Sequence, residues 1–158
     1  MSAGQALHTR AQFSFVAHAG VDVAWPLFGA EGERAWAPGW DPAFMWPAEP
    51  GDREGMVFKI RHGLGTAIWV NTAFDALAGR IQYVYVIPEV VVTVISLQLS
   101  PLGEATQVAV TYERTALSEA ATHQVATLAE SDKTAGEEWS RQIDGHLRAR
   151  RQPGEFLR

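Results

Sequence analysis

The feature that most constrains the fold is a run of strand-like sequence from Met56 to Tyr112, broken only by short turn segments. Apolar and polar side chains alternate along it, as they do in strands that bury one face. Turn-forming residues recur at close intervals, for example at Gly63-Leu64-Gly65 and from Pro101 to Glu104. Consecutive strands joined by such short connections pair antiparallel. The run therefore predicts an antiparallel sheet built as a meander of hairpins.

The turn positions also predict the register of this sheet. A three-residue loop at Gly63-Leu64-Gly65 and a turn over Ala76 to Gly79 place bulky apolar residues of adjacent strands opposite one another. The predicted cross-strand pairs are Ile60 with Ile68, Phe74 with Ile81, Thr72 with Tyr83, Val70 with Tyr85, Tyr85 with Thr93, and Thr93 with Tyr112. In this register one face is continuously apolar and forms the core, whereas Lys59, Trp69 and Asn71 fall on the opposite face.

Helical segments are predicted on both sides of the meander. A strand from Gln12 to Ala19 precedes two short helices, the first capped by Asp22 and the second running from Glu31 to Trp36. After the sheet, apolar residues recur every three or four positions, which predicts an apolar helical stripe. Poor helix formers between Ser131 and Gly136 predict a break. The more regular helix then runs from about Thr134 to Arg150 and covers the apolar face of the sheet.

Composition narrows the class of protein. The 158 residues suit one domain, taken as 1–158, and the net charge of −5 argues against nucleic acid as a partner. The absence of cysteine excludes disulfides and a thiol nucleophile. The stretch Met1 to Arg10 lacks the apolar core of a signal peptide, and Pro88-Glu89 divides the apolar run Ile81 to Leu99. We therefore expect no membrane insertion and a cytoplasmic location.

Three local segments carry a family resemblance. Phe13-Ser14-Phe15 leads into Ala24-Trp25-Pro26-Leu27-Phe28, and Trp36-Ala37-Pro38-Gly39-Trp40 and the segment from Thr111 to Glu119 follow later. With the order of elements, they resemble an uncharacterised bacterial branch of the SRPBCC superfamily, which includes START lipid-transfer domains and polyketide cyclase-like proteins. The resemblance implies an α+β helix-grip fold, in which a curved antiparallel sheet of about seven strands wraps around a long C-terminal helix. It also implies two short helices after the first strand, which a lipocalin barrel lacks, and a cavity for hydrophobic molecules.

Hydroxyl-bearing residues are predicted to gather on the apolar face. They are Tyr83, Tyr85, Tyr112, Thr72 and Thr93, with Arg114 two residues beyond Tyr112 on the same face. A buried hydroxyl without a hydrogen-bond partner costs about 1–3 kcal/mol, so these groups need one another, water or a ligand. The pattern fits a small-molecule pocket, and it also fits a tyrosine-rich core whose hydroxyls reach the rim of the sheet. Arg114 either clamps an anionic group or ends its strand in water.

The six tryptophans form a second candidate set. Trp36, Trp40 and Trp46 flank a segment rich in proline and glycine, where they either wall or gate the mouth of a cavity or pack helices onto the sheet. Trp139 suits packing better. Trp69, on the predicted outer face, is a candidate surface or homodimer contact.

Other chemistries have less support in the sequence. The five histidines show no metal-ligand spacing, His62 is interpreted as a solvated turn residue, and neither a metal nor a cofactor is expected. Glu33 and Glu138 are interpreted as solvated surface residues. Asp132, near the helical stripe, is either a helix cap or a buried general base, and capping is favoured.

These observations favour a protein that binds a hydrophobic or aromatic small molecule, such as a lipid or a polyketide, between the sheet and the C-terminal helix. The alternative is a polyketide cyclase/dehydratase-like enzyme using Tyr85, Tyr112, Arg114 or Asp132 as acid–base groups. The predicted cavity has no histidine, and tyrosine, with a pKa near ~10, is a poor base at neutral pH. Binding is therefore favoured over catalysis, and no catalytic residue is assigned. A third hypothesis is an Hsp90-activator-like interaction domain with a filled core.

Overall fold

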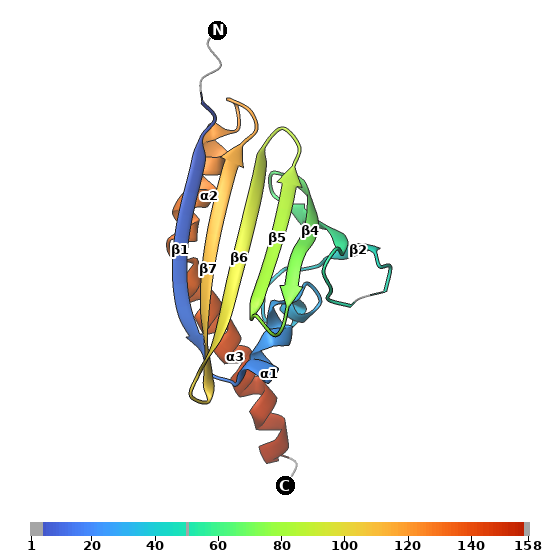
Figure 1. Ribbon diagram of the computed structural model, residues 1–158, viewed down its shortest axis with the longest axis vertical. Helices are drawn as coiled ribbons and strands as arrows, with labels where there is room; N and C mark the ends of the chain where they lie inside the picture. The colour runs from blue at the N-terminus through green and yellow to red at the C-terminus, as the bar shows by residue number, and fades with distance from the viewer. Residues whose placement is uncertain (1–4, 50, 157–158) are drawn as a thin grey trace.

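The computed structural model describes residues 5–49 and 51–156, so the first residues of the polar N-terminal stretch lie outside it. The described residues form a seven-stranded antiparallel sheet in the order β1-β7-β6-β5-β4-β3-β2. The strands are β1 (His8–Ala17), β2 (Ala43–Trp46), β3 (Val57–His62), β4 (Gly65–Asp75), β5 (Arg80–Ile87), β6 (Val91–Leu102) and β7 (Ala105–Ala116). Helices α2 (Thr122–Asp132) and α3 (Ala135–Phe156) cross one face of the sheet (Figure 1). This is the predicted helix-grip arrangement.

The core lies between that face of the sheet and the helices. Alternate residues of the central strands point inward, which buries Ile81 and Ile87 of β5 and Val108 and Val110 of β7. Ile143 of α3 is fully buried against this surface. The period of two in the strands and the three- and four-residue spacing in the helix therefore meet at one apolar interface, as predicted.

The predicted register of the β3–β4 hairpin is wrong by one residue. His62 pairs with Gly65, so only two residues form the turn, and Lys59 rather than Ile60 lies opposite Ile68. The inner face gains Trp69 in exchange for Ile68, which is 39% exposed. The indole of Trp69 packs against the ring of Phe58 at a centroid distance of 5.5 Å. Burying the larger aromatic surface outweighs exposing the smaller aliphatic one.

A bulge changes the register again between β4 and β5. Phe74 pairs with Ile81 as predicted, but an irregularity between Asn71 and Ala73 places Asn71 rather than Thr72 opposite Tyr83. Asn71 is therefore buried on the inner face, and Thr72 is exposed on the outer one. Since Trp69 also faces inward, the reason for regarding it as a homodimer contact is lost.

The remaining hairpins keep the predicted faces. Tyr85 pairs with Thr93 as expected. The β6–β7 turn is two residues tighter than predicted, with Leu102 opposite Ala105, so the pairing moves by two residues. A shift of two preserves which side chains point inward. It does place Arg114, rather than Tyr112, opposite Thr93.

The short helices after β1 are present. They are α1 (Val21–Ala24) and the 3₁₀ helices η1 (Trp25–Phe28) and η2 (Gly32–Ala35). Asp22 lies inside α1 and does not cap it, because the N-cap residue is Gly20. The predicted break near Ser131 is confirmed, since α2 ends at Asp132 and α3 begins at Ala135. Across the described ranges, no helix combines the length and the apolar character needed to cross a bilayer.

Candidate ligand-binding cavity

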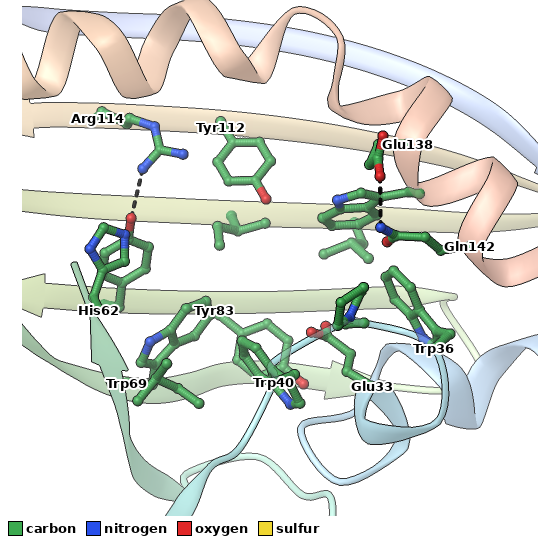
Figure 2. A pocket seen from close by; sticks show the side chains of 17 residues that line it. Glu33, Trp36, Trp40, His62, Trp69, Tyr83, Tyr112, Arg114, Glu138 and Gln142 are labelled. Atoms are coloured by element: carbon green, nitrogen blue, oxygen red, sulfur yellow. Dashed lines mark hydrogen bonds between the residues drawn. The ribbon is translucent and has the colours of Figure 1, made fainter.

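A cavity of about 410 Å³ lies between the inner face of the sheet, the segment around η2, and α3. Its walls are mainly aromatic: the residues of this kind that line it are Trp36, Trp40, Trp69, Tyr83, Tyr85, Tyr112 and Trp139. Figure 2 shows His62 and Arg114 at one end of the cavity and Glu33, Trp36 and Gln142 toward the other. We call these the arginine end and the glutamate end.

Most of the predicted site residues meet at this cavity. Tyr83, Tyr85, Tyr112, Arg114, Trp36 and Trp40 all line it. Thr93 is fully buried beside Arg114. Two predictions are wrong: the Thr72 hydroxyl donates to Gln82 on the exposed side of the sheet, and Trp46 is 55% exposed on β2. Thr72 is turned outward by the bulge in β4, and Trp46 lies on the edge strand.

The arginine end is a closed hydrogen-bond network. Arg114 donates from Nε and Nη2 to both carboxylate oxygens of Asp132, at 2.8 and 2.7 Å. Its Nη1 donates to the Tyr85 hydroxyl at 2.7 Å and to the Thr93 hydroxyl at 3.1 Å. The guanidinium also lies over the ring of Tyr112, 4.8 Å from its centroid. The network joins three strands to the end of α2.

This network corrects two interpretations of the sequence. Arg114 does not end its strand in water, and its charge is already compensated by Asp132; both side chains are about 5% exposed. Burial acts to lower the pKa of Arg114, but the bonds and charges of Asp132 and Tyr85 raise it overall. Asp132 neither caps the helix break nor is free to act as a base, because both its oxygens accept from Arg114.

The segment around η2 is held by the side-chain carboxylate of Asp52, which bonds to its backbone. The Asp52 carboxylate accepts a hydrogen bond from the backbone N–H of Glu31 at 3.1 Å. This approach requires glycine at position 29, since a Cβ there would lie 1.9 Å from the carboxylate. The indole N–H groups of Trp36 and Trp40 donate to the carbonyls of Leu27 and Ala30, at 2.7 and 2.6 Å. Both indole N–H groups are therefore already satisfied within this segment.

Glu33 lies on the cavity wall, where the sequence predicted a solvated surface residue. Its carboxylate makes no hydrogen bond with any other residue in the described ranges. Burial raises the pKa of Glu33 well above its usual range, and the negative charge of Asp52 raises it further. The cavity thus contains a carboxyl group that was not predicted from the sequence.

His62 is also a cavity residue rather than a solvated turn residue. Its Nδ1 accepts a hydrogen bond from the backbone N–H of Leu64 at 3.0 Å, which places the ring proton on Nε2. Burial lowers the pKa of His62, and the charge of Arg114 lowers it further. A neutral His62 therefore offers the cavity an N–H donor and not a base.

The tyrosine hydroxyls have different roles. Tyr83 donates to the carbonyl of Phe28 at 3.0 Å, and Tyr85 accepts from Arg114. The Tyr112 hydroxyl points away from Arg114 into the cavity (Figure 2) and has no hydrogen-bond partner among the described residues. Burial raises the pKa of Tyr112 above its usual value despite the opposing effect of the nearby Arg114 charge. Tyr112 is thus a neutral hydroxyl available to a ligand.

Simple spacing rules would have found both missed residues. Glu33 lies three positions before Trp36, and residues three apart share a side of a 3₁₀ helix. His62 lies two positions after Ile60, so the two share a face of β3. No group of three or more His, Cys, Asp or Glu is placed to hold a metal ion within the described part of the chain.

Comparison with known proteins places the fold. Neither a protein-family model nor a curated protein matches the sequence. Among solved structures, the chain is similar to norcoclaurine synthase from Thalictrum flavum in complex with dopamine and hydroxybenzaldehyde, with a TM-score of 0.67, 11% identity, and coverage of 93% of this chain and 90% of that one. It is similar to Ara h 8.0201, with a TM-score of 0.63, 11% identity, and coverage of 90% and 99%.

A bacterial protein extends the comparison. CalU16 from Micromonospora echinospora gives a TM-score of 0.58 at 17% identity, with coverage of 94% of this chain and 78% of that one. Identities this low establish shared architecture and leave the ligand and the activity open. The chain therefore has the helix-grip fold, as its sequence predicted, and shares this architecture with these proteins.

Proposed function

We propose that this protein binds a flat, hydrophobic small molecule containing an aromatic ring. The observation that carries the proposal is the cavity itself, about 410 Å³ in volume and walled by aromatic rings. Ligand sites typically have volumes of roughly 300–1,000 Å³, apolar walls and a small number of placed polar groups. Here the polar groups include Glu33, His62 and the Tyr112 hydroxyl.

The arrangement of the rings favours a planar occupant. Trp69 stacks on Tyr85 with a centroid distance of 4.6 Å, and Trp40 meets Trp69 edge-on at 5.3 Å. On the other side, Trp36 and Trp139 are 5.6 Å apart. Aromatic side chains held in this way offer both faces and edges to a further ring. The cavity supports ligand binding over an interaction domain with a filled core.

A second candidate function is acid–base catalysis of the cyclase/dehydratase kind. Glu33 favours it, because its carboxyl group lines the cavity without a hydrogen-bond partner among the described residues and burial raises its pKa, as is typical of carboxyl groups that act as general acids or bases. The structure of norcoclaurine synthase is a complex with two aromatic small molecules, dopamine and hydroxybenzaldehyde, so that protein combines this fold with such ligands. Binding remains our first proposal, since His62 offers no base to pair with Glu33.

The proposal is tested by native mass spectrometry and by calorimetry with a neutral probe, 2-(1-naphthyl)ethanol. We expect either a bound mass that is lost on denaturation or one-to-one binding of the probe. Ile95→Phe should abolish binding, because Ile95 lines the cavity. Val94→Phe places the same side chain on the opposite face of β6 and should leave binding unchanged. Absence of both a bound mass and probe binding, or equal binding by the two variants, would contradict the proposal.

A further inference from the structure

The charges around the cavity are compensated unequally. Arg114 is paired with Asp132. Glu138, at the rim, accepts hydrogen bonds from Gln142 and Arg141. Arg34, the cation next to Glu33 in sequence, points to Glu31 and Asp41 on the surface. Glu33 is therefore the cavity carboxylate that has no cation beside it within the described residues.

The surroundings of Glu33 suit a cation. Rings of Trp36, Trp40, Tyr83 and Tyr112 line the same cavity. The negative face of an aromatic ring attracts a cation, and the attraction is stronger when both are shielded from water. The charge of Asp52 acts on Glu33 and the charge of Glu33 acts on Tyr83, so the local field is negative. A positive group placed here would be attracted by the carboxylates and by the rings together.

We infer that the occupant carries a protonated amine, which binds beside Glu33 while its aromatic ring lies against the tryptophan and tyrosine walls. The inference rests on the proposed function and specifies its ligand class as arylalkylamines. An ammonium group would convert a half-buried, uncompensated carboxylate into an ion pair and offset its repulsion with Asp52. The arginine end offers no comparable attraction for an anion, since Asp132 neutralises Arg114.

Three probes that share one ring system separate the possible head groups. They are 2-(1-naphthyl)ethylamine, its neutral analogue 2-(1-naphthyl)ethanol, and the anionic 1-naphthylacetate. We expect calorimetry at pH 7 to give a dissociation constant at least about tenfold lower for the amine than for the alcohol, and the weakest binding for the carboxylate. A protonated Glu33 that simply donates a hydrogen bond to a neutral acceptor would instead favour the alcohol.

Matched variants assign the effect to Glu33. Glu33→Gln keeps the shape of the side chain and removes its charge, so the preference for the amine over the alcohol should disappear. Glu31→Gln is the control: the same change two residues away, on a carboxylate that faces Arg34 on the surface, which should keep the preference. Circular dichroism of both variants verifies that they fold.

The possible failures are distinguishable. Amine and alcohol binding with equal affinity, or a preference that survives in Glu33→Gln, would overturn the amine inference and leave the proposed function standing. Absence of binding by all three probes at millimolar concentration would contradict both. A preference lost in both glutamine variants would overturn the assignment to Glu33, because it would point to the net charge of the segment.

Discussion

Glu33 lines one end of the cavity and Asp132 lies behind Arg114 at the other, and these two carboxylates are compensated in opposite ways. Asp132 at the arginine end is held by two hydrogen bonds from one guanidinium, which in turn holds Tyr85 and Thr93. Glu33 at the glutamate end has aromatic rings around it and a second negative charge, Asp52, nearby. The first arrangement serves the fold, because its polar groups satisfy one another. The second leaves a polar group unsatisfied until something else binds.

The largest effect on stability is expected from breaking the hydrogen-bond network at the arginine end. Asp132→Asn removes the charge that compensates Arg114, and loss of one partner of a buried ion pair typically costs about 3–5 kcal/mol of unfolding free energy. Denaturant unfolding measures it. The control is Glu130→Gln, which breaks the exposed ion pair between Glu130 and Lys133. It should change the unfolding free energy by less than about 1 kcal/mol. If Asp132→Asn lowers the unfolding free energy by less than about 1 kcal/mol, the network does not stabilise the fold.

A smaller difference is expected between two tyrosines at the same end. Tyr85→Phe leaves an Arg114 N–H without its acceptor and should lower the unfolding free energy by about 1–3 kcal/mol. Tyr112→Phe removes a hydroxyl with no partner among the described residues, so its stability should change by less than about 0.5 kcal/mol. Parallel denaturant curves compare them. Equal losses in both variants would contradict the division of roles between the two hydroxyls.

At the glutamate end, removing the carboxylate should stabilise the protein instead of destabilising it. The pKa of Glu33 is raised in the folded protein, so its contribution to stability is fully present below the unfolded value of about 4.3 and is lost as pH rises through the native pKa. Glu33→Gln lacks this loss and should therefore be more stable than the wild type at pH 7.5. The two proteins should converge near pH 4.

Thermal unfolding across that pH range is the measurement. The groups that face Glu33, namely Asp52, Tyr83 and Tyr112, are kept in the variant, so the difference between the curves reports on Glu33 and on its interaction with them. A variant less stable than the wild type at pH 7.5 would mean that the Glu33 carboxylate makes a stabilising interaction in the folded protein. The proposed cation site would then lose its basis.

The contrast between the two ends also bears on which features could be predicted from the sequence. Alternation and helical spacing predicted the sheet, the break near Ser131 and the covering helix, because these patterns reflect burial that repeats over many residues. The gathering of Tyr83, Tyr85 and Arg114 was also predicted, since a register error of two residues preserves faces. The bulge between Asn71 and Ala73 was not predicted, because one extra residue in a strand leaves the local pattern nearly unchanged.

Long-range partners were beyond the sequence pattern. Asp132 meets Arg114 only because α2 folds back onto β7, and spacing within either element carries no sign of the other. Glu33 was interpreted as surface because glutamate is rarely buried, and this expectation fails where a carboxyl group lines a cavity. Glu33 is thus a residue for which composition gives the wrong expectation, which is expected where a site departs from the rules of folding.

The smallest effect should come from Thr72, and it tests the register directly. Thr72 and Thr93 were both predicted to face the cavity, yet the Thr72 hydroxyl bonds to Gln82 on the exposed side, whereas Thr93 is fully buried against Arg114. Thr72→Val, which keeps the branched shape suited to a strand, should change stability by less than about 0.5 kcal/mol and leave probe affinity unchanged. Thr93→Val should cost about 1–2 kcal/mol, because it removes an acceptor from a buried guanidinium. A tenfold loss of probe affinity in Thr72→Val would indicate that Thr72 faces the cavity, which would contradict the bulge between Asn71 and Ala73.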